Sequence, residues 1–202
     1  MERTDFDLTL SHKQYGVLLL DPPWRFETYS VKGITARSPD SKYPVERLEA
    51  LKRLPIGEYA AENCVMFMWV IDSHLDQALE LMAAYGFVFK TIAFCWVKTT
   101  RTGKPVMSLG LWTRKGMEIC LLGTKGKPTR RGKGVRQVIH SPRREHSRKP
   151  DEVYERIEEL VDGPYCEAFS RQRWPGWDQI ISNEEDKFTV GERNDLYDLK
   201  VP

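Results

Sequence analysis

Val17-Leu18-Leu19-Leu20, followed at once by Asp21-Pro22-Pro23-Trp24, is the stretch that decides the fold. A short, continuously apolar run is typical of a strand that is buried on both faces, as in a parallel sheet. Two successive prolines remove two backbone donors and fix φ, so they predict a rigid turn whose carbonyls point outward unpaired. The sequence therefore predicts a buried strand that ends in a stiff turn and carries a carboxylate to the edge of a sheet.

Similar apolar runs recur along the chain and predict further strands. They are expected at residues 65–70, within 87–97 and at 119–122, with weaker candidates at 165–169 and 177–181. Apolar residues at helical spacing predict helices over residues 44–54, 75–85 and 151–161. Ser73 and Asp76 resemble a capping box at the start of the second helix.

Strands that alternate with helices imply an α/β sheet with right-handed crossovers. Ligands bind to such sheets beyond the carboxyl ends of the strands, which here are the ends at Leu20, Phe169 and Ile181. Residues after about Asp186 lose all periodicity. We therefore expect one domain over residues 1–186 and a loosely structured tail over 187–202.

The composition fits one globular domain. The chain has 202 residues, of which 30% are charged and 41% hydrophobic, and its net charge is +2. No run of roughly 18 apolar residues occurs, and the polar start of the chain does not resemble a secretory signal. These features predict an intracellular, cytoplasmic protein.

Cysteine and histidine spacing argues against a metal centre. The four cysteines lie far apart, each in or beside an apolar run, and the four histidines form no ligand pair. Neither a C-x-x-C pair nor a Cys/His cluster with zinc spacing occurs. We expect buried, reduced thiols and no metal.

One segment concentrates positive charge. Between Thr124 and Lys149 there are ten Lys or Arg residues and a single acid, Glu145. Glycines and prolines are interspersed, so the segment is expected to be a mobile basic loop. A solvated surface is one interpretation; phosphate contact is the other, because unmixed positive charge in an otherwise nearly neutral chain suits a polyanion.

The turn at Asp21 suits a specific chemical problem. The amino nitrogen of adenine is a poor nucleophile, because its lone pair is delocalised into the ring. Asp21 could accept one N–H and the carbonyl of Pro22 the other, while Trp24 offers a face for an unstacked base. Asp21 would also stabilise the positive charge that arrives on the nitrogen. A stiff turn with a packed tryptophan is the structural alternative.

An ordered series of motifs resembles one family of amino-group methyltransferases, the MT-A-seventy family, which includes messenger-RNA adenosine methyltransferases and bacterial and phage DNA adenine methyltransferases. The resemblance runs from about Val17 to Glu184. Its pieces are Asp21-Pro22-Pro23-Trp24-Arg25-Phe26, Phe67-Met68-Trp69-Val70, Trp96-Val97-Lys98, Gly110-Leu111-Trp112-Thr113-Arg114, Glu118 to Gly126, Glu145 to Glu152, Glu167-Ala168-Phe169-Ser170-Arg171 and Pro175-Gly176-Trp177-Asp178.

The resemblance implies a Rossmann-like methyltransferase sheet with a permuted motif order and S-adenosylmethionine as the cofactor. The implied catalytic residues are Asp21, Pro22, Pro23 and Trp24. The implied cofactor-binding residues are Asp21, Lys149, Pro150, Glu167, Phe169, Arg171, Arg173, Asn183 and Glu184. Of these, Arg171 and Arg173 are expected at the amino-acid end of the cofactor, and Asn183 and Glu184 at its ribose hydroxyls. The expected substrate-binding residues are Trp24, Tyr29, Tyr43, Trp112, Arg130, Arg131, Lys133 and Arg148.

The implied function is transfer of a methyl group from S-adenosylmethionine to N6 of adenine in nucleic acid, with DNA favoured over RNA. DNA is favoured because the Gly110 to Arg114 and His146 to Tyr154 segments resemble the bacterial and phage members. Three alternatives stay open: an RNA methyltransferase, an inactive nucleic-acid-binding subunit, and a protein-glutamine methyltransferase. Asp21, rather than asparagine, disfavours the last. The sequence leaves open whether the protein acts alone, as a homodimer or with a partner subunit.

Overall fold

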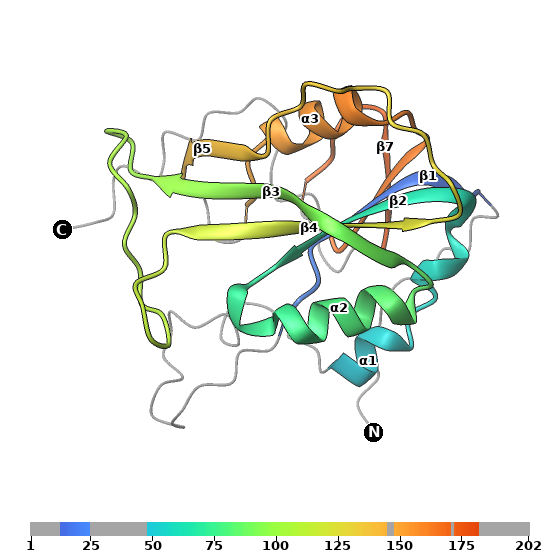
Figure 1. Cartoon of the computed structure of the whole chain (residues 1–202), viewed down its shortest axis with the longest axis horizontal. Coiled ribbons are helices and arrows are strands. Elements are labelled where there is room, and N and C mark those ends of the chain that lie inside the picture. Colours follow the sequence, from blue (N-terminus) through green and yellow to red (C-terminus); the bar gives the residue numbers. More distant parts are fainter. Residues whose placement is uncertain (1–12, 25–47, 145–147, 171, 182–202) are drawn as a thin grey trace.

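A computed structural model describes residues 13–24, 48–144, 148–170 and 172–181 of the chain (Figure 1). The predicted tail over 187–202 lies outside these residues. The strands are β1 (Tyr15–Leu20), β2 (Ala60–Val70), β3 (Val88–Thr99), β4 (Met117–Lys125), β5 (Val138–Pro142), β6 (Tyr165–Ala168) and β7 (Trp177–Ile180). The helices are α1 (Leu48–Lys52), α2 (Leu75–Ala84) and α3 (Glu152–Leu160), with short 3₁₀ turns η3 (Ile56–Glu58) and η4 (Asp72–His74).

All seven strands form a single sheet in the order β5-β3-β4-β2-β1-β6-β7. β1 pairs in parallel with both β2 and β6, and β6 pairs in parallel with β7. The exception is β4, which runs antiparallel to both of its neighbours, β2 and β3. The fold is therefore the expected α/β class with a mixed sheet, consistent with a Rossmann-like methyltransferase.

Side-chain alternation along β1 explains the layered arrangement. Leu18 and Leu20 point into a core that includes Leu51 of α1 and Leu81 of α2. Val17 and Leu19 point to the opposite face, into a core built partly on α3. Because both faces of the strand are covered, its sequence is continuously apolar. Figure 1 shows α1 and α2 on one side of the sheet and α3 on the other.

Two sequence-based expectations about local structure were wrong, and one connection had not been predicted. A hairpin rather than a helical crossover joins β3 to β4, which makes β4 antiparallel. The basic segment is not a mobile loop throughout, because it contains β5, paired with β3. Ser73 does not cap α2: the N-cap is His74 without a side-chain cap, and the Ser73 hydroxyl bonds the His74 ring at 3.0 Å.

The order of the strands creates a switch point at the carboxyl edge of the sheet, the position at which open α/β sheets form a ligand-binding crevice. The chain leaves β1 toward β2 on one side, whereas it leaves β6 toward β7 on the other. Between β1 and β6 the connections diverge, which is the position where open α/β sheets bind ligands. Asp21 immediately follows β1 at this point, and its backbone N–H donates to the Ala168 carbonyl at 3.4 Å.

Among the residues that the structure describes, no helix has the length and apolar character needed to cross a membrane. The same residues contain no cluster of three or more His, Cys, Asp or Glu side chains suited to a metal ion.

Candidate active site

The centre of the site is an ion pair between two residues that the sequence analysis singled out. Lys149, just before α3, places Nζ 2.6 Å from Oδ2 of Asp21. The two side chains are 12% and 24% exposed, respectively. Such a charged contact is short and partly desolvated, so it fixes the direction of the carboxylate at the mouth of the crevice.

A second carboxylate extends this pair into a row of alternating charges. Nζ of Lys149 also lies 3.5 Å from Oε2 of Glu118, at the start of β4, and Lys98, at the end of β3, forms an ion pair with the same carboxylate. Burial alone would raise the pKa of Glu118, but the Lys149 and Lys98 ammonium groups hold that pKa below its ordinary value. Glu118 therefore remains ionised beside Lys149.

The sequence analysis assigned no role to Glu118 or Lys98. Each lies in a motif that carried the family resemblance, and that is the signal that could have identified them. Their proximity to Asp21 depends on the antiparallel pairing that sets Trp96 of β3 opposite Glu118 of β4. That pairing was not expected from the sequence.

The turn after β1 differs from its prediction in one respect. The carbonyl of Pro22 is not unpaired, because the Trp24 N–H donates to it at 2.8 Å. This bond closes a three-residue turn. A carbonyl oxygen has two lone pairs, so Pro22 keeps the capacity to accept a second N–H.

Trp24 is packed rather than presented to solvent. Its indole is 6% exposed, its Nε1–H donates to the Trp69 carbonyl at 3.0 Å, and its ring is tilted against His74 with centroids 6.1 Å apart. An open face for a stacked base is therefore not available at this side chain. The hydrogen bond of Trp24 ties the turn after β1 to the carboxyl end of β2.

A buried chain of hydrogen bonds supports the segment that carries Lys149. Arg148 Nε donates to Gln172 Oε1 at 3.1 Å, Gln172 Nε2 donates to the Tyr154 hydroxyl at 3.1 Å, and Tyr154 donates to Glu167 at 2.9 Å. All four side chains are buried. This chain of hydrogen bonds joins Arg148, the residue next to Lys149, to Glu167 of β6.

Arg148, a predicted substrate-binding residue, takes part in this buried chain of hydrogen bonds. Arg148 was expected to contact the substrate, but it is 3% exposed and its Nε–H bonds Gln172. The sequence pattern could not reveal this, because an arginine in a basic run is usually solvated and its burial depends on partners that are remote in sequence.

Glu167 is the most perturbed acid of the crevice. It lies near the carboxyl end of β6, and burial raises its pKa to about 8, while the Tyr154 hydrogen bond acts in the opposite direction. The nearby Asp21 charge raises the pKa further. Glu167 is therefore largely protonated at neutral pH. Protonation lowers the cost of burying a carboxyl group this deeply.

The described part of the crevice fits a cationic, adenosine-bearing cofactor. The Asp21 carboxylate supplies negative charge, and two buried apolar residues, Phe169 and Pro150, lie next in the chain to β6 and to Lys149. Phe169 and Ile181, directly after β6 and β7, have positive φ angles of 65° and 54°. Such backbone is uncommon for non-glycine residues and clusters at ligand sites.

Several predicted site residues cannot be placed in this geometry. Arg171, Asn183, Glu184, Tyr29 and Tyr43 lie outside the described residues, so their roles stay predictions. Arg173 is described and exposed, on the connection between β6 and β7.

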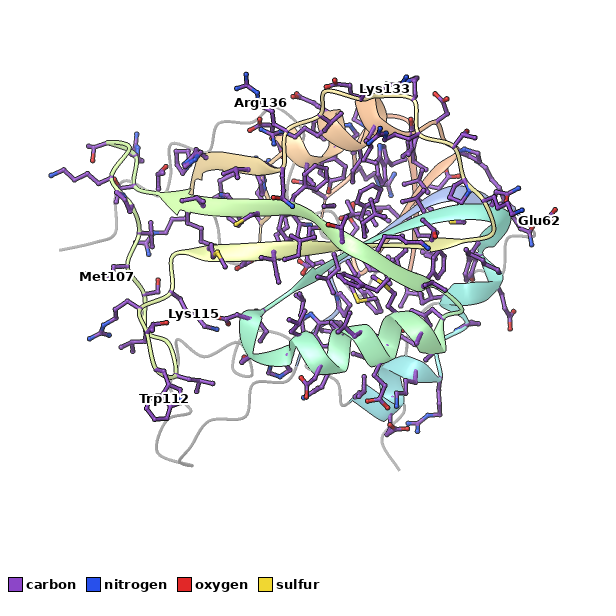
Figure 2. The ribbon with its side chains drawn as sticks, viewed as in Figure 1. Glu62, Met107, Trp112, Lys115, Lys133 and Arg136 are labelled. Carbon is purple, nitrogen blue, oxygen red and sulfur yellow. The ribbon has the colours of Figure 1, made fainter. Side chains whose placement is uncertain are left out.

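The predicted phosphate-binding residues divide into two groups. Arg130 and Lys133 are exposed, and Figure 2 shows Lys133 and Arg136 projecting outward beside α3. Arg131 instead pairs with Asp162 at 2.6 Å and donates to the carbonyls of Glu158 and Glu159 at the end of α3. Those contacts engage Arg131 with the C-terminal carbonyls of a helix, which favour a cation.

Trp112, also predicted to contact the substrate, lies in the hairpin between β3 and β4 and is 95% exposed. The structure thus brings the ionisable groups of Asp21, Lys149 and Glu167 close together, and leaves Trp112, Arg130 and Lys133 on the outer surface.

Comparison with known proteins finds a family and several relatives that match most of this chain. A family model described as MT-A70, the MT-A-seventy family of the sequence resemblance, matches residues 15–182. The chain is 31% identical over 204 residues to the type II methyltransferase M.MunI of Mycoplasma sp, an alignment that covers 91% of this chain and 85% of that protein.

Longer relatives match over part of their length. The human N(6)-adenosine-methyltransferase catalytic subunit METTL3 is 28% identical over 170 residues, which cover 81% of this chain and 27% of METTL3. The human N(6)-adenine-specific methyltransferase METTL4 is 29% identical over 180 residues, which cover 82% of this chain and 36% of METTL4. The chain therefore spans about a quarter to a third of these proteins. Its match to the family model and its likeness to M.MunI show that the chain belongs to the MT-A70 family of S-adenosylmethionine-dependent adenine methyltransferases.

Proposed function

We propose that this protein methylates N6 of adenine in DNA. The observation that carries the proposal is the Asp21–Lys149 ion pair at the carboxyl end of β1, beside the crevice between β1 and β6. The ion pair supports the proposal because it fixes the direction of a carboxylate that would accept an N–H of an extruded adenine. Bound S-adenosylmethionine supplies an electrophilic methyl group.

Within this mechanism Asp21 activates the amino nitrogen. Lys149 engages Oδ2 of Asp21, so Oδ1 is the oxygen that faces an incoming N–H. A hydrogen bond from adenine to this oxygen and a second to the Pro22 carbonyl would turn the nitrogen lone pair out of the ring plane. As the bond between nitrogen and the methyl group forms, the bond between that methyl group and sulfur would break and S-adenosylhomocysteine would be released. The same carboxylate would stabilise the positive charge on nitrogen and accept the proton that the nitrogen loses. Glu118 and Lys98 keep Lys149 in place during the reaction.

The proposed preference for DNA rests on how much of each relative aligns with this chain and on two segments of similar sequence. M.MunI, a type II methyltransferase, aligns with this chain over most of both proteins, whereas the adenosine methyltransferases are matched over a minor part of their length. The chain also resembles the bacterial and phage DNA members in its Gly110 to Arg114 and His146 to Tyr154 segments. We further propose that it acts in the cytoplasm of a bacterial host. A second subunit or a homodimer fits the same chemistry.

Methyl transfer to matched oligonucleotides tests the proposal. Wild-type protein is incubated with radiolabelled S-adenosylmethionine and DNA or RNA of the same sequence, single- and double-stranded, and the products are digested to nucleosides. Label in N6-methyldeoxyadenosine is the expected result. A tenfold or greater preference for RNA would overturn the choice of DNA while leaving the adenine chemistry intact, and label on another base would overturn the chemistry itself.

A further inference from the structure

Trp69 lies near the carboxyl end of β2, the strand next to β1 in the middle of the sheet (Figure 1). The register pairs Leu20 of β1 with Met68 of β2, so Asp21, the next residue, follows at the level of Trp69. Successive residues of a strand point to opposite faces. Phe67 and Trp69 therefore point into the core on the α3 side, and Met68 points into the core on the other side.

Two parts of Trp69 contact the two halves of the site. Its backbone carbonyl accepts the Nε1–H of Trp24 at 3.0 Å, and this bond holds the turn that carries Asp21. The ammonium of Lys149 lies 5.6 Å from the centroid of the Trp69 ring. A lysine ammonium within about 6 Å of an aromatic ring is attracted to its face, most strongly when the ring is an indole. One strand position therefore contacts both the turn of Asp21 and the cation that pairs with Asp21.

The contact with Lys149 is the property that distinguishes tryptophan at this position. The bond to Trp24 uses a backbone carbonyl, which any residue would supply. The Nε1–H of Trp69 is buried and, among the residues that the structure describes, has no hydrogen-bond partner. A buried N–H without a partner lowers stability. Phenylalanine would avoid that cost, but its ring attracts a cation less strongly than an indole does.

The surroundings of Lys149 make a third contact valuable. Its ammonium lies 2.6 Å from Asp21 and 3.5 Å from Glu118, so two carboxylates attract it. A lysine ammonium is carried on a flexible stem of four carbons, which an ion pair alone restricts only partly. The Trp69 ring is buried and the Lys149 side chain is little exposed, and cation–π attraction is stronger for desolvated groups.

We propose that Trp69 is a positioning residue for methyl transfer: its ring orients the ammonium of Lys149, which in turn fixes the carboxylate of Asp21. The inference rests on the proposed function and adds to it the residue that aligns both partners of the ion pair. Because Trp69 acts through the direction of Asp21, its loss lowers kcat more than it raises the KM for S-adenosylmethionine.

Fluorination of the indole tests the proposal, because fluorine withdraws electron density from the ring with little change of shape. Tryptophan with one, two or three ring fluorines is introduced at position 69 alone, and kcat is measured for methyl transfer to an adenine-containing oligonucleotide. We expect kcat to fall with each added fluorine, by about tenfold over the whole series.

Two controls accompany the fluorine series. In Lys149→Met no cation faces the ring, so fluorine at position 69 should not change the residual kcat. Trp177 is a second buried indole, whose Nε1–H donates to Glu158 at 2.8 Å. Fluorination of Trp177 should leave the wild-type kcat unchanged.

Truncation variants separate positioning from packing. Trp69→Leu and Phe67→Leu each remove a buried ring from the same face of β2, so both should lower the free energy of unfolding measured in urea. Only Trp69→Leu should lower kcat, and Trp69→Phe should keep part of the wild-type kcat. If Trp69→Leu does not fold, the fluorine series still decides, because it keeps the ring in place.

The possible outcomes separate this inference from the proposed function. Methylation by the wild type, with a kcat that does not respond to fluorine at position 69, would overturn the inference alone. An equal response in the Lys149→Met background would do the same, because the ring would then act independently of Lys149. A wild type that methylates no oligonucleotide would overturn the proposed function and the positioning role with it.

Discussion

Nζ of Lys149 lies 2.6 Å from Oδ2 of Asp21, although the two residues are 128 positions apart in the sequence. The contact brings together the turn after β1 and the segment before α3. It defines the site more sharply than either residue does alone, because an isolated aspartate has no fixed direction. The first two predictions concern this pair.

Replacing Asp21 by alanine should abolish most methyl transfer without unfolding the protein. Loss of an electrostatic contact to the reacting atoms typically costs about 10²–10³ in rate. Asp21 lies at the end of a strand rather than in the core, so circular dichroism should be unchanged. Asp76→Asn, an exposed acid on α2, is the control and should turn over normally. Wild-type turnover by folded Asp21→Ala protein would refute the mechanism.

Lys149→Met should lower kcat by up to about a hundredfold, because a misdirected carboxylate loses its alignment with the amino group. Lys149→Arg should keep part of the wild-type kcat, because it keeps the positive charge. In a double-mutant cycle, Asp21→Ala combined with Lys149→Met should be scarcely slower than Asp21→Ala alone. Lys52→Met, which breaks an ion pair of α1, is the matched control. Additive rate losses would show that Lys149 acts independently of Asp21.

Tyr154→Phe should destabilise the protein by about 1–3 kcal/mol, because it leaves buried polar groups of Glu167 and Gln172 without their partner. Tyr165→Phe is the comparison, since it also loses one hydroxyl bond, to the Val161 carbonyl, but in a partly exposed position. Urea unfolding measures the free energy of unfolding of both variants. An equal loss of unfolding free energy in the two variants would contradict a larger contribution from the buried hydrogen-bond chain.

The raised pKa of Glu167 predicts how the stability of the protein depends on pH. Its pKa is about 8 in the folded protein against an ordinary value of 4.5, so the folded state binds the proton more tightly. The stabilisation is complete below pH 4.5 and is lost as pH rises through about 8. Glu167→Gln cannot titrate. The difference in unfolding free energy between wild type and Glu167→Gln should therefore move in favour of the variant between pH 5 and pH 8.5. A constant difference would contradict the raised pKa.

Mutations in the basic segment should distinguish residues that bind phosphate, Arg130 and Lys133, from one that stabilises the fold, Arg131. Replacing Arg130 and Lys133 by glutamine should flatten the salt dependence of duplex DNA binding by up to about 0.9 per lost phosphate contact. Arg131→Gln should instead lower the unfolding free energy, because it loses its contacts at the end of α3. Cofactor affinity should not change in either. If the salt dependence of DNA binding changed only in Arg131→Gln, then Arg131, and not Arg130 or Lys133, would be the phosphate contact.

Much of this protein could be predicted from local sequence. The apolar run before Asp21 predicted β1, and its burial on both faces followed from an unbroken pattern that only a covered strand requires. The ordered motifs indicated the family, which the comparisons confirm. The strand ends at Leu20, Phe169 and Ile181 were identified as the edge to examine, and the parallel pairing of β1, β6 and β7 brings them to the same edge of the sheet. These features depend on residues that are close in sequence or on a pattern that repeats.

Tertiary structure alone decided which polar residues became partners. The burial of Arg148, the protonation of Glu167 and the position of Glu118 beside Lys149 all depend on contacts between remote segments. Trp24 and Trp112 are the same residue type, yet one is buried against Trp69 and the other stands on a hairpin tip. The physical reason is that desolvation and hydrogen bonding depend on the full three-dimensional surroundings, whereas a sequence pattern reports only which face a residue shares with its neighbours.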